Sequence, residues 1–257
     1  MVKPKVPVLI TSSAIAHDTS VNLSRLEDRL NYTLESIAKW LEISPDTQFV
    51  ICDGSGYDFS HLVRARFPEA IAEFLHFNND VNQVQLHGRG YGEGEIVKFA
   101  IQNSRYISEA ECFAKCTAKL WVSNYLECLK YWNGSLLMKG VFKNAFTPWK
   151  KTEFTYIDTR FYICSTATYR RLFEEAHHKI NVARGHGLEE CFREELIKNK
   201  VSNYLMTNPP VIFGMGGGTG VQYKNTLIRR HKEKLRYQIV KHNREFRLLF
   251  VEQLCTS

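Results

Sequence analysis

The chain has 257 residues, of which 44% are hydrophobic, enough for the buried core of one large domain or two small ones. Its formal net charge of +7 suits anionic partners: nucleotides, nucleic acid or an anionic membrane surface. The 7 cysteines are scattered without a CxxC pair, which argues against a disulfide framework and favours reduced thiols in a cytosol. No apolar run approaches the roughly 20 residues of a membrane-spanning helix, and no signal-peptide pattern is visible.

The N-terminal part of the chain predicts a strand, a helix and a second strand. Residues 6–10 (VPVLI) are a short apolar run, residues 22–41 carry leucines at helical spacing, and residues 48–52 (QFVIC) form the next apolar run. The first strand is followed by the polar residues Thr11, Ser12 and Ser13. Asp53 follows the second strand, so both polar ends share the sheet edge where α/β sheets bind ligands. Asp53 then either binds a base or ribose or belongs to a plain Asp-Gly turn.

Alternating glycines from residue 88 to residue 94 predict a loop, with a helix following over about residues 95–102. The loop carries Arg89, Gly90 and Glu93. Glycine lets backbone approach a ligand closely, and the free N–H groups at a helix start attract anions. The stretch is therefore interpreted either as half of a site for a phosphorylated ligand or as a mobile surface loop before a solvated helix.

The remaining elements follow from apolar spacing and from runs of β-forming residues. Helices are predicted over residues 62–74, with an interruption at Pro68, and over residues 122–132, 166–176 and 188–198. Strands are predicted over residues 75–77, 139–145 and 154–165.

Charged residues mark two of these elements. Asp158 and Arg160 lie inside a β-forming run, as an edge-strand salt pair or at a point where the strand meets a ligand. Glu189 and Glu190 lie in the first turn of a helix that follows a glycine-rich segment. Carboxylates are common there because the helix dipole favours them, and a general base at the rim of a site is the functional alternative.

The C-terminal part combines a glycine run with a basic segment. Residues 214–220 contain five glycines but lack the Lys-Ser/Thr of a P-loop, so they are interpreted as a lid that orders over substrate. Residues 226–257 are rich in lysine and arginine and have an apolar side. This basic amphipathic pattern suits a membrane surface or ordinary docking on the core.

Seven segments in this order resemble bacterial glycosyltransferases that build lipopolysaccharide O-antigens and capsules. They are VLITSSA, RLED, ICDGSG, GRGYGEGEIVKFAIQNS, FAKCTAKLWVSN, IDTRFYICS and GLEECF, and they span most of residues 6–225. The resemblance implies a GT-A-like, Rossmann-like α/β sandwich with a mixed central sheet flanked by helices and the nucleotide-sugar donor at its carboxyl edge. The expected organisation is a GT-A-like domain over residues 1–225 and a helical tail over residues 226–257.

The chain departs from that family in lacking an Asp-x-Asp, the motif that holds Mg²⁺ or Mn²⁺ on the donor diphosphate. Related sequences have Lys-x-Thr-Gly-Arg at the comparable place, where this chain reads Lys115-Cys116-Thr117-Ala118-Lys119. The resemblance then implies that Lys115, Lys119 and either Arg89 or Arg160 neutralise the diphosphate in place of a metal. No metal and no other cofactor is expected.

The resemblance also assigns roles in an inverting transfer of a hexosyl or deoxyhexosyl group to a growing envelope polysaccharide. Residues 185–190 are similar to the Gly-x-x-x-Glu-Asp pattern of inverting enzymes, which makes Glu189 or Glu190 the base that deprotonates the acceptor. Donor-binding residues are expected to be Thr11, Ser12, Ser13, Asp53, Arg89, Gly90, Lys115, Thr117 and Lys119. Acceptor- or sugar-binding residues are expected to be Glu93, Asp158 and Arg160. The expected location is the cytoplasm, with the basic tail near a lipid-linked acceptor at the inner membrane.

Three other functions remain open at this point. A nucleotidyltransferase or sulfotransferase has similar strand–loop–helix phosphate sites. A nucleic-acid-binding module would suit the charge, but the basic residues concentrate at the C-terminus and no DNA- or RNA-binding signature is present, so no nucleic-acid partner is expected. A non-catalytic scaffold of an envelope complex would tolerate the loss of both Glu189 and Glu190.

Overall fold

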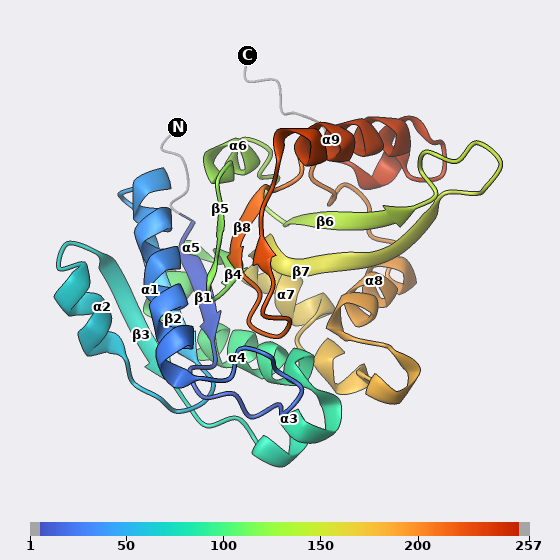
Figure 1. Ribbon diagram of the computed structural model, residues 1–257. Helices are drawn as coiled ribbons and strands as arrows, with labels where there is room; N and C mark the ends of the chain where they lie inside the picture. The colour runs from blue at the N-terminus through green and yellow to red at the C-terminus, as the bar shows by residue number, and fades with distance from the viewer. Residues whose placement is uncertain (1–5, 252–257) are drawn as a thin grey trace.

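The computed structural model describes residues 6–251 (Figure 1). A six-stranded sheet runs through its centre in the order β3-β2-β1-β4-β7-β6. Its strands are β1 (Val8–Ser12), β2 (Gln48–Asp53), β3 (Ile71–His76), β4 (Cys112–Thr117), β6 (Leu136–Lys143) and β7 (Glu153–Ser165). The first four are mutually parallel, whereas β7 runs antiparallel to β4 and β6 antiparallel to β7. The predicted mixed central sheet is therefore confirmed.

Helices cover both faces of this sheet because alternate strand residues point to opposite sides. On one face, Val8 and Ile10 pack with α1 (Leu26–Ile43) and α2 (Ser60–Arg66). On the other face, Leu9 packs in the core that contains four further helices. These are α4 (Arg89–Asn103), α5 (Arg105–Ala110), α7 (Thr166–Leu172) and α8 (Leu188–Lys198). The result is a sandwich of helices, sheet and helices.

A second, antiparallel sheet lies beside α1 at the end of β4. It consists of β5 (Leu120–Val122), β8 (Ile212–Met215) and β9 (Gln222–Tyr223), in the order β5-β8-β9. The Trp40 indole N–H of α1 donates to the Leu120 carbonyl (3.1 Å), which fixes this sheet on the helix. Gly214 of β8 is required here, because a Cβ at that position would lie 2.0 Å from the Lys119 carbonyl oxygen. The remaining elements are α3 (Val81–His87), α6 (Tyr125–Leu129), η1 (Ala176–Lys179), η2 (Val182–Arg184), α9 (Leu227–His242) and η3 (Arg247–Leu249).

Two predictions about local structure were wrong. Residues 71–74 were expected to be helical, but they belong to β3, because the helix ends at Arg66 just before Phe67-Pro68. The glycines after residue 88 were expected to form a loop, but α4 begins at Arg89 and contains them. Their role is close packing, since a Cβ at Gly94 would lie 2.4 Å from the His177 ring. The break before α4 is Gly88, whose φ of 78° favours glycine.

The predicted helix in the basic tail is present as α9, and it packs on the β6 edge of the sheet (Figure 1). The Tyr237 hydroxyl donates to the Gly140 carbonyl (2.7 Å), and Val240 is fully buried. This is the docking on the core that the sequence left as one of two options. Residues 252–257 of the predicted tail lie outside the described residues. Among the helices of residues 6–251, none has the length and apolarity to cross a bilayer.

Candidate functional site

A cavity of about 680 Å³ opens at the carboxyl ends of β1 and β4, a volume typical of ligand sites. The first turns of α4 and α8 form its other walls, and the glycine loop between β8 and β9 lies over it. The structure brings most of the predicted site residues to this cavity. Those that line it are Thr11, Ser12, Ser13, Arg89, Gly90, Glu93, Thr117, Lys119, Arg160, Glu189 and Glu190.

Lys119 is the most unusual cation of the cavity. It has a left-handed backbone with φ of 73°, which is rare for a side-chain-bearing residue and typical of strained functional positions. Only 3% of its surface is exposed, yet within residues 6–251 its ammonium makes neither a hydrogen bond nor an ion pair. Burial, with a further contribution from Arg29, lowers the pKa of Lys119 to about 7. An anion bound in the cavity would supply the missing partner.

Arg29 and the glycine loop complete the surroundings of Lys119. The Arg29 guanidinium donates to the carbonyls of Ser13 (2.9 and 2.5 Å) and Leu23 (2.7 Å), so it is held beside the cavity and forms no ion pair within residues 6–251. The loop packs tightly on these cations. A Cβ at Gly217 would lie 2.8 Å from the Lys119 Cε, and one at Gly218 would lie 2.5 Å from the Arg89 guanidinium. Glycine is therefore needed for backbone to cover the basic side chains.

A second segment fixes the glycine loop in this position. The Asn22 backbone N–H donates to the Gly218 carbonyl (3.0 Å), and its side-chain amide donates to the Thr219 carbonyl (2.9 Å). These two contacts fix the glycine loop, the segment predicted to act as a lid, where it lines the cavity.

Glu189 and Glu190 are adjacent but differ in what binds them. The Glu190 carboxylate accepts a hydrogen bond from the Gly187 N–H (3.0 Å), so it caps the start of α8. Glu189 lines the cavity, and within the described residues no other residue donates a hydrogen bond to its carboxylate or forms an ion pair with it. Burial raises the pKa of Glu189, with smaller contributions from the negative charges of Glu93, Glu190 and Asp158. A free carboxylate with a raised pKa is suited to proton abstraction.

Lys115 is not placed where the sequence predicted, because it does not line the cavity. Its side chain is fully buried under α4, and its three ammonium protons have three acceptors. These are Glu93 Oε1 (2.6 Å), Thr117 Oγ1 (2.8 Å) and the Thr159 carbonyl (2.8 Å). In this structure Lys115 positions two cavity residues, Glu93 and Thr117, and has no proton left for a diphosphate.

Two of the predicted site carboxylates also lie outside the cavity lining. Asp53 accepts hydrogen bonds from the Ala14 N–H (2.7 Å) and from the Ser55 N–H and hydroxyl (2.8 and 2.5 Å). It therefore holds the loop after β1 in shape rather than presenting an oxygen to a nucleoside. Asp158 is buried and binds the Arg160 guanidinium through both oxygens (2.7 and 2.5 Å). Arg160 itself lines the cavity, stacked on the Tyr223 ring at 4.7 Å.

Arg29 and Tyr223 are cavity residues that the sequence interpretation did not select. The signal for Arg29 was its position on the apolar side of the predicted helix, in register with Thr33, Ser36 and Trp40, which are all buried. Arginine is rarely buried unless its charge has a partner, so an arginine on the buried face of a helix indicates a special role. In the structure Arg29 lines the cavity. Nothing in the sequence marked Tyr223, because its place depends on a two-residue strand.

Comparison with known proteins identifies a shared fold. No protein-family model matches the sequence, and no curated protein matches it. The inositol-1-phosphate CTP transferase from T. maritima aligns with 94% of this chain and 98% of its own, with a TM-score of 0.52 and 10% identity. An active-site mutant of LgtC aligns over 74% of this chain and 70% of its own, with a TM-score of 0.49 and 13% identity. LgtC has also been solved as a galactosyltransferase with donor and acceptor sugar analogues.

At these identities the likeness establishes architecture and nothing finer. The chain has the α/β sandwich with a mixed central sheet flanked by helices that the sequence resemblance implied, and it shares this fold with the inositol-1-phosphate CTP transferase. Its chemistry has to be inferred from the cavity.

Proposed function

We propose that the chain is a nucleotide-dependent transferase, and more specifically a glycosyltransferase that moves a sugar from a nucleotide-diphosphate donor to an acceptor hydroxyl. The observation that carries the proposal is that one cavity holds both a buried cation, Lys119, and a carboxylate, Glu189, neither of which has a side-chain partner among the described residues. Displacement at an anomeric carbon needs both functions: cations for the departing diphosphate and a base for the acceptor hydroxyl. The fold shared with a CTP transferase supports the broader part of this proposal, that the chain is a nucleotide-dependent transferase.

The donor diphosphate is assigned to the side of the cavity that carries Arg29, Arg89 and Lys119. The first turn of α4 adds the backbone N–H group of Gly90. The hydroxyls of Thr11, Ser12 and Thr117 lie on the same side, and the Thr11 hydroxyl is buried without a partner among the described residues. An orphaned hydroxyl in such a place is available to a phosphate oxygen or a ribose.

The acceptor hydroxyl is assigned to the side of Glu189. In the transfer, the acceptor oxygen attacks the anomeric carbon, its proton goes to the Glu189 carboxylate, and the bond from that carbon to the diphosphate oxygen breaks. Charge builds on the diphosphate, where Lys119 and the arginines stabilise it. The proposed displacement is a single step and therefore inverts the anomeric carbon. Arg160, fixed by Asp158, and Glu93, fixed by Lys115, are left to bind sugar hydroxyls.

Charge neutralisation without a divalent ion is part of the proposal. The end of β4 and the turn after it provide Thr117 and Lys119 where the resembled family carries an Asp-x-Asp. The two nearby carboxylates are already engaged, Asp53 by the loop and Glu93 by Lys115 and Thr117. The Lys119 ammonium and the Thr11 hydroxyl at this edge match phosphate better than Mg²⁺.

The acceptor is proposed to be a lipid-linked or oligosaccharide precursor of a cell-envelope polysaccharide, reached at the inner membrane face. This part rests on the sequence resemblance and on α9. Two apolar residues at the start of that helix, Leu227 and Ile228, are 71% and 82% exposed, next to Arg229 and Arg230. Exposed apolar and basic side chains together suit an anionic membrane surface.

The test is a panel of nucleotide sugars, scored by thermal shift and by hydrolysis, with and without EDTA. Stabilisation by a UDP- or dTDP-sugar that persists in EDTA is the expected result. Stabilisation that EDTA abolishes and that added Mg²⁺ or Mn²⁺ restores would overturn the metal-free diphosphate site. Preference for an oligonucleotide over every nucleotide sugar would overturn the transferase proposal.

A nucleotidyltransferase is the second candidate, favoured by the nearly full-length alignment with the CTP transferase. Such an enzyme would combine a nucleoside triphosphate with a phosphorylated substrate and release pyrophosphate. Incubation with each nucleoside triphosphate and a set of sugar phosphates, followed by a pyrophosphate assay, separates the two candidates. Pyrophosphate release would favour the second, and release of nucleoside diphosphate from a nucleotide sugar favours the first.

A further inference from the structure

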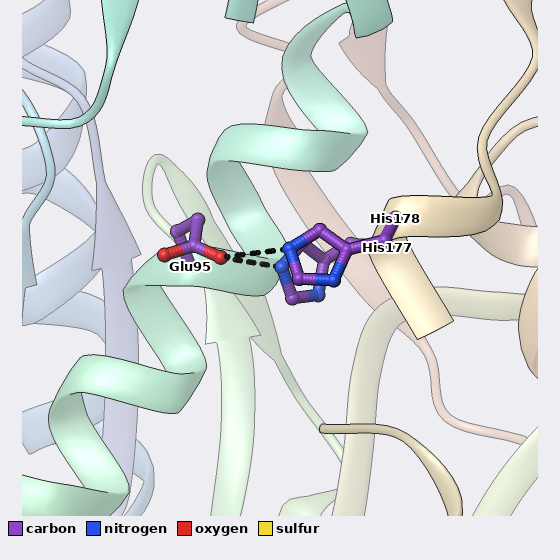
Figure 2. A group of neighbouring side chains, drawn as sticks. All are labelled: Glu95, His177 and His178. Carbon is purple, nitrogen blue, oxygen red and sulfur yellow. Dashed lines mark hydrogen bonds and ion pairs between the residues drawn. The ribbon is translucent and has the colours of Figure 1, made fainter. Parts of the chain in front are cut away.

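Three potential metal ligands meet outside the cavity, on the outer side of α4. Glu95 of α4 faces the neighbouring residues His177 and His178 of η1, and Figure 2 shows both rings directed at its carboxylate. His177 Nε2 lies 2.5 Å and His178 Nε2 lies 3.6 Å from the same oxygen, Glu95 Oε1. None of the three residues lines the cavity.

The surroundings of His178 orient its ring as they would for a metal ligand. The Glu175 carboxylate lies 2.8 Å from His178 Nδ1, and Lys98 holds that carboxylate from its other oxygen (2.6 Å). A carboxylate only accepts, so His178 Nδ1 donates to Glu175, and this contact turns the Nε2 edge of the ring toward Glu95. A ring nitrogen and a carboxylate oxygen that face each other in this way can bind one cation together. A carboxylate behind the second ring nitrogen is also the usual support of a metal-binding histidine.

We propose that Glu95, His177 and His178 bind one divalent transition-metal ion of the Zn²⁺ type. Two imidazole nitrogens and one carboxylate oxygen are ligands that Zn²⁺ accepts. With metal–ligand bonds of about 2.0–2.1 Å, tetrahedral ligands stand about 3.3 Å apart. The His178–Glu95 distance already fits, and the His177–Glu95 pair opens by roughly 0.8 Å on binding. The fourth position falls to water, because the side chains of His178 and Glu95 are 44% and 28% exposed.

The ion would fasten α4 to η1 and thereby stabilise a wall of the cavity. His177 is fully buried, its ring lies edge-on to Tyr91 at 5.2 Å, and Gly94 leaves room for it on α4. The same helix supplies Gly90, Gly92 and Glu93 to the cavity. The metal takes no part in the transfer, since its ligands are outside the cavity.

The experiment uses the full chain after EDTA treatment and dialysis. Calorimetric titration with Zn²⁺ and visible spectroscopy with Co²⁺ are run on the wild type and on four variants: Glu95→Gln, His178→Ala, Glu175→Gln and His61→Ala. His61, an exposed histidine of α2, is the matched control. Neither measurement uses a nucleotide, so failure here is distinguishable from failure of the proposed function.

The expected result is one strong Zn²⁺ site per chain with the d–d bands of tetrahedral Co²⁺, retained in His61→Ala. Glu175→Gln should weaken binding about 10- to 100-fold, and loss of a direct ligand should weaken it at least as much. Circular dichroism checks that each variant is folded. His178→Ala is expected to fold because the His178 side chain is 44% exposed. Absence of a wild-type site, or equal binding by His178→Ala and the wild type, would overturn the proposal.

Discussion

The two sides of the cavity differ in charge and in the way that charge is balanced. On the α1 and β4 side, Arg29 and Lys119 are buried and bind no carboxylate among the described residues. On the α8 side, Glu189 faces the cavity and forms no ion pair with any residue between 6 and 251, whereas Glu190 caps the helix. Buried charges that lack a partner of opposite sign lower the stability of the folded protein when no ligand is bound. They are useful when one side receives an anion and the other receives a proton.

The largest effect is expected from removing the charge of Glu189. Glu189→Gln keeps the shape of the side chain but removes the base, so turnover should fall by about 10²- to 10⁴-fold. Affinity for the donor should stay within a few-fold, because the diphosphate lies on the other side. Initial rates with the donor identified by thermal shift, together with calorimetric donor titration, measure both quantities.

Glu190→Gln is the matched control for that variant. Its carboxylate binds the Gly187 N–H, so the substitution should cost about 1 kcal/mol of stability or less and reduce turnover far less. If the two variants lost turnover equally, the distinction between a free base and a helix cap would be wrong.

The next largest effect distinguishes Lys115, on β4, from Lys119, in the turn just after β4. Lys119→Met should weaken nucleoside diphosphate binding roughly 10- to 100-fold, since a hydrogen bond to a charged group contributes about 1.5–3 kcal/mol. Lys115→Met should instead destabilise the fold by about 3 kcal/mol, because it leaves Glu93 without its partner in a partly buried position. Urea unfolding and calorimetry on both variants measure the contrast.

Lys119→Met itself should unfold at the same or a higher denaturant concentration than the wild type. Its ammonium is buried without a partner among residues 6–251, so removing it relieves a cost. If Lys119→Met were destabilised while Lys115→Met stayed stable and bound nucleoside diphosphate weakly, Lys115 would be the diphosphate-binding lysine and Lys119 the structural one.

Several strands and helices that carry the site could be predicted from the sequence, because apolar runs and helix caps are local properties. The sequence predicted the helix over residues 188–198, as the structure has it. It also predicted the first strand, over residues 6–10, whereas β1 covers Val8–Ser12 and so includes Thr11 and Ser12. It could not tell Lys115 from Lys119. In an extended strand, positions four apart share a face, but a left-handed turn at Lys119 carries that side chain into the cavity while Lys115 stays under α4. Turn geometry of this kind depends on contacts with β8, far along the chain.

The same limit explains Asp53 and the glycines of α4. An Asp-Gly after a strand has one sequence pattern whether its oxygens face a ligand or the loop, and only the Ala14 and Ser55 contacts decide it. Glycines that predict a loop can also mark helix packing, and the partner at Gly94 is His177, more than 80 residues away. Long-range contacts, rather than local propensity, settled each of these positions.

A smaller effect is expected in the pH dependence of diphosphate binding, which tests the side of the cavity that carries Lys119. The Lys119 pKa is about 7 in the unliganded fold, against about 10.4 in an unfolded chain. A diphosphate binds the protonated form, so its affinity should fall by up to about tenfold per pH unit as pH rises above 7. Calorimetry in buffers of different ionisation enthalpy should show proton uptake, and Lys119→Met should show none from this group.

The unliganded protein should have the opposite dependence on pH. Between pH 7 and about 10.4 the unfolded chain holds one more proton at Lys119 than the fold does, so stability rises with pH relative to Lys119→Met. A wild type whose stability difference from Lys119→Met is flat over this range would contradict the depressed pKa.

The smallest effect is expected at the start of α9, where the exposed residues are not part of the cavity lining. Arg229→Glu and Ile228→Asp alter exposed residues at the start of that helix and should leave turnover on a soluble acceptor unchanged. Binding to vesicles with anionic lipids should weaken by about 1 kcal/mol per basic residue removed, and added salt should weaken it further. Co-sedimentation measures this, with neutral vesicles as the control. Equal sedimentation of wild type and variants with anionic vesicles would show that α9 packs on the sheet without binding a membrane. That result would not affect the roles proposed for the two sides of the cavity, because it concerns α9 alone.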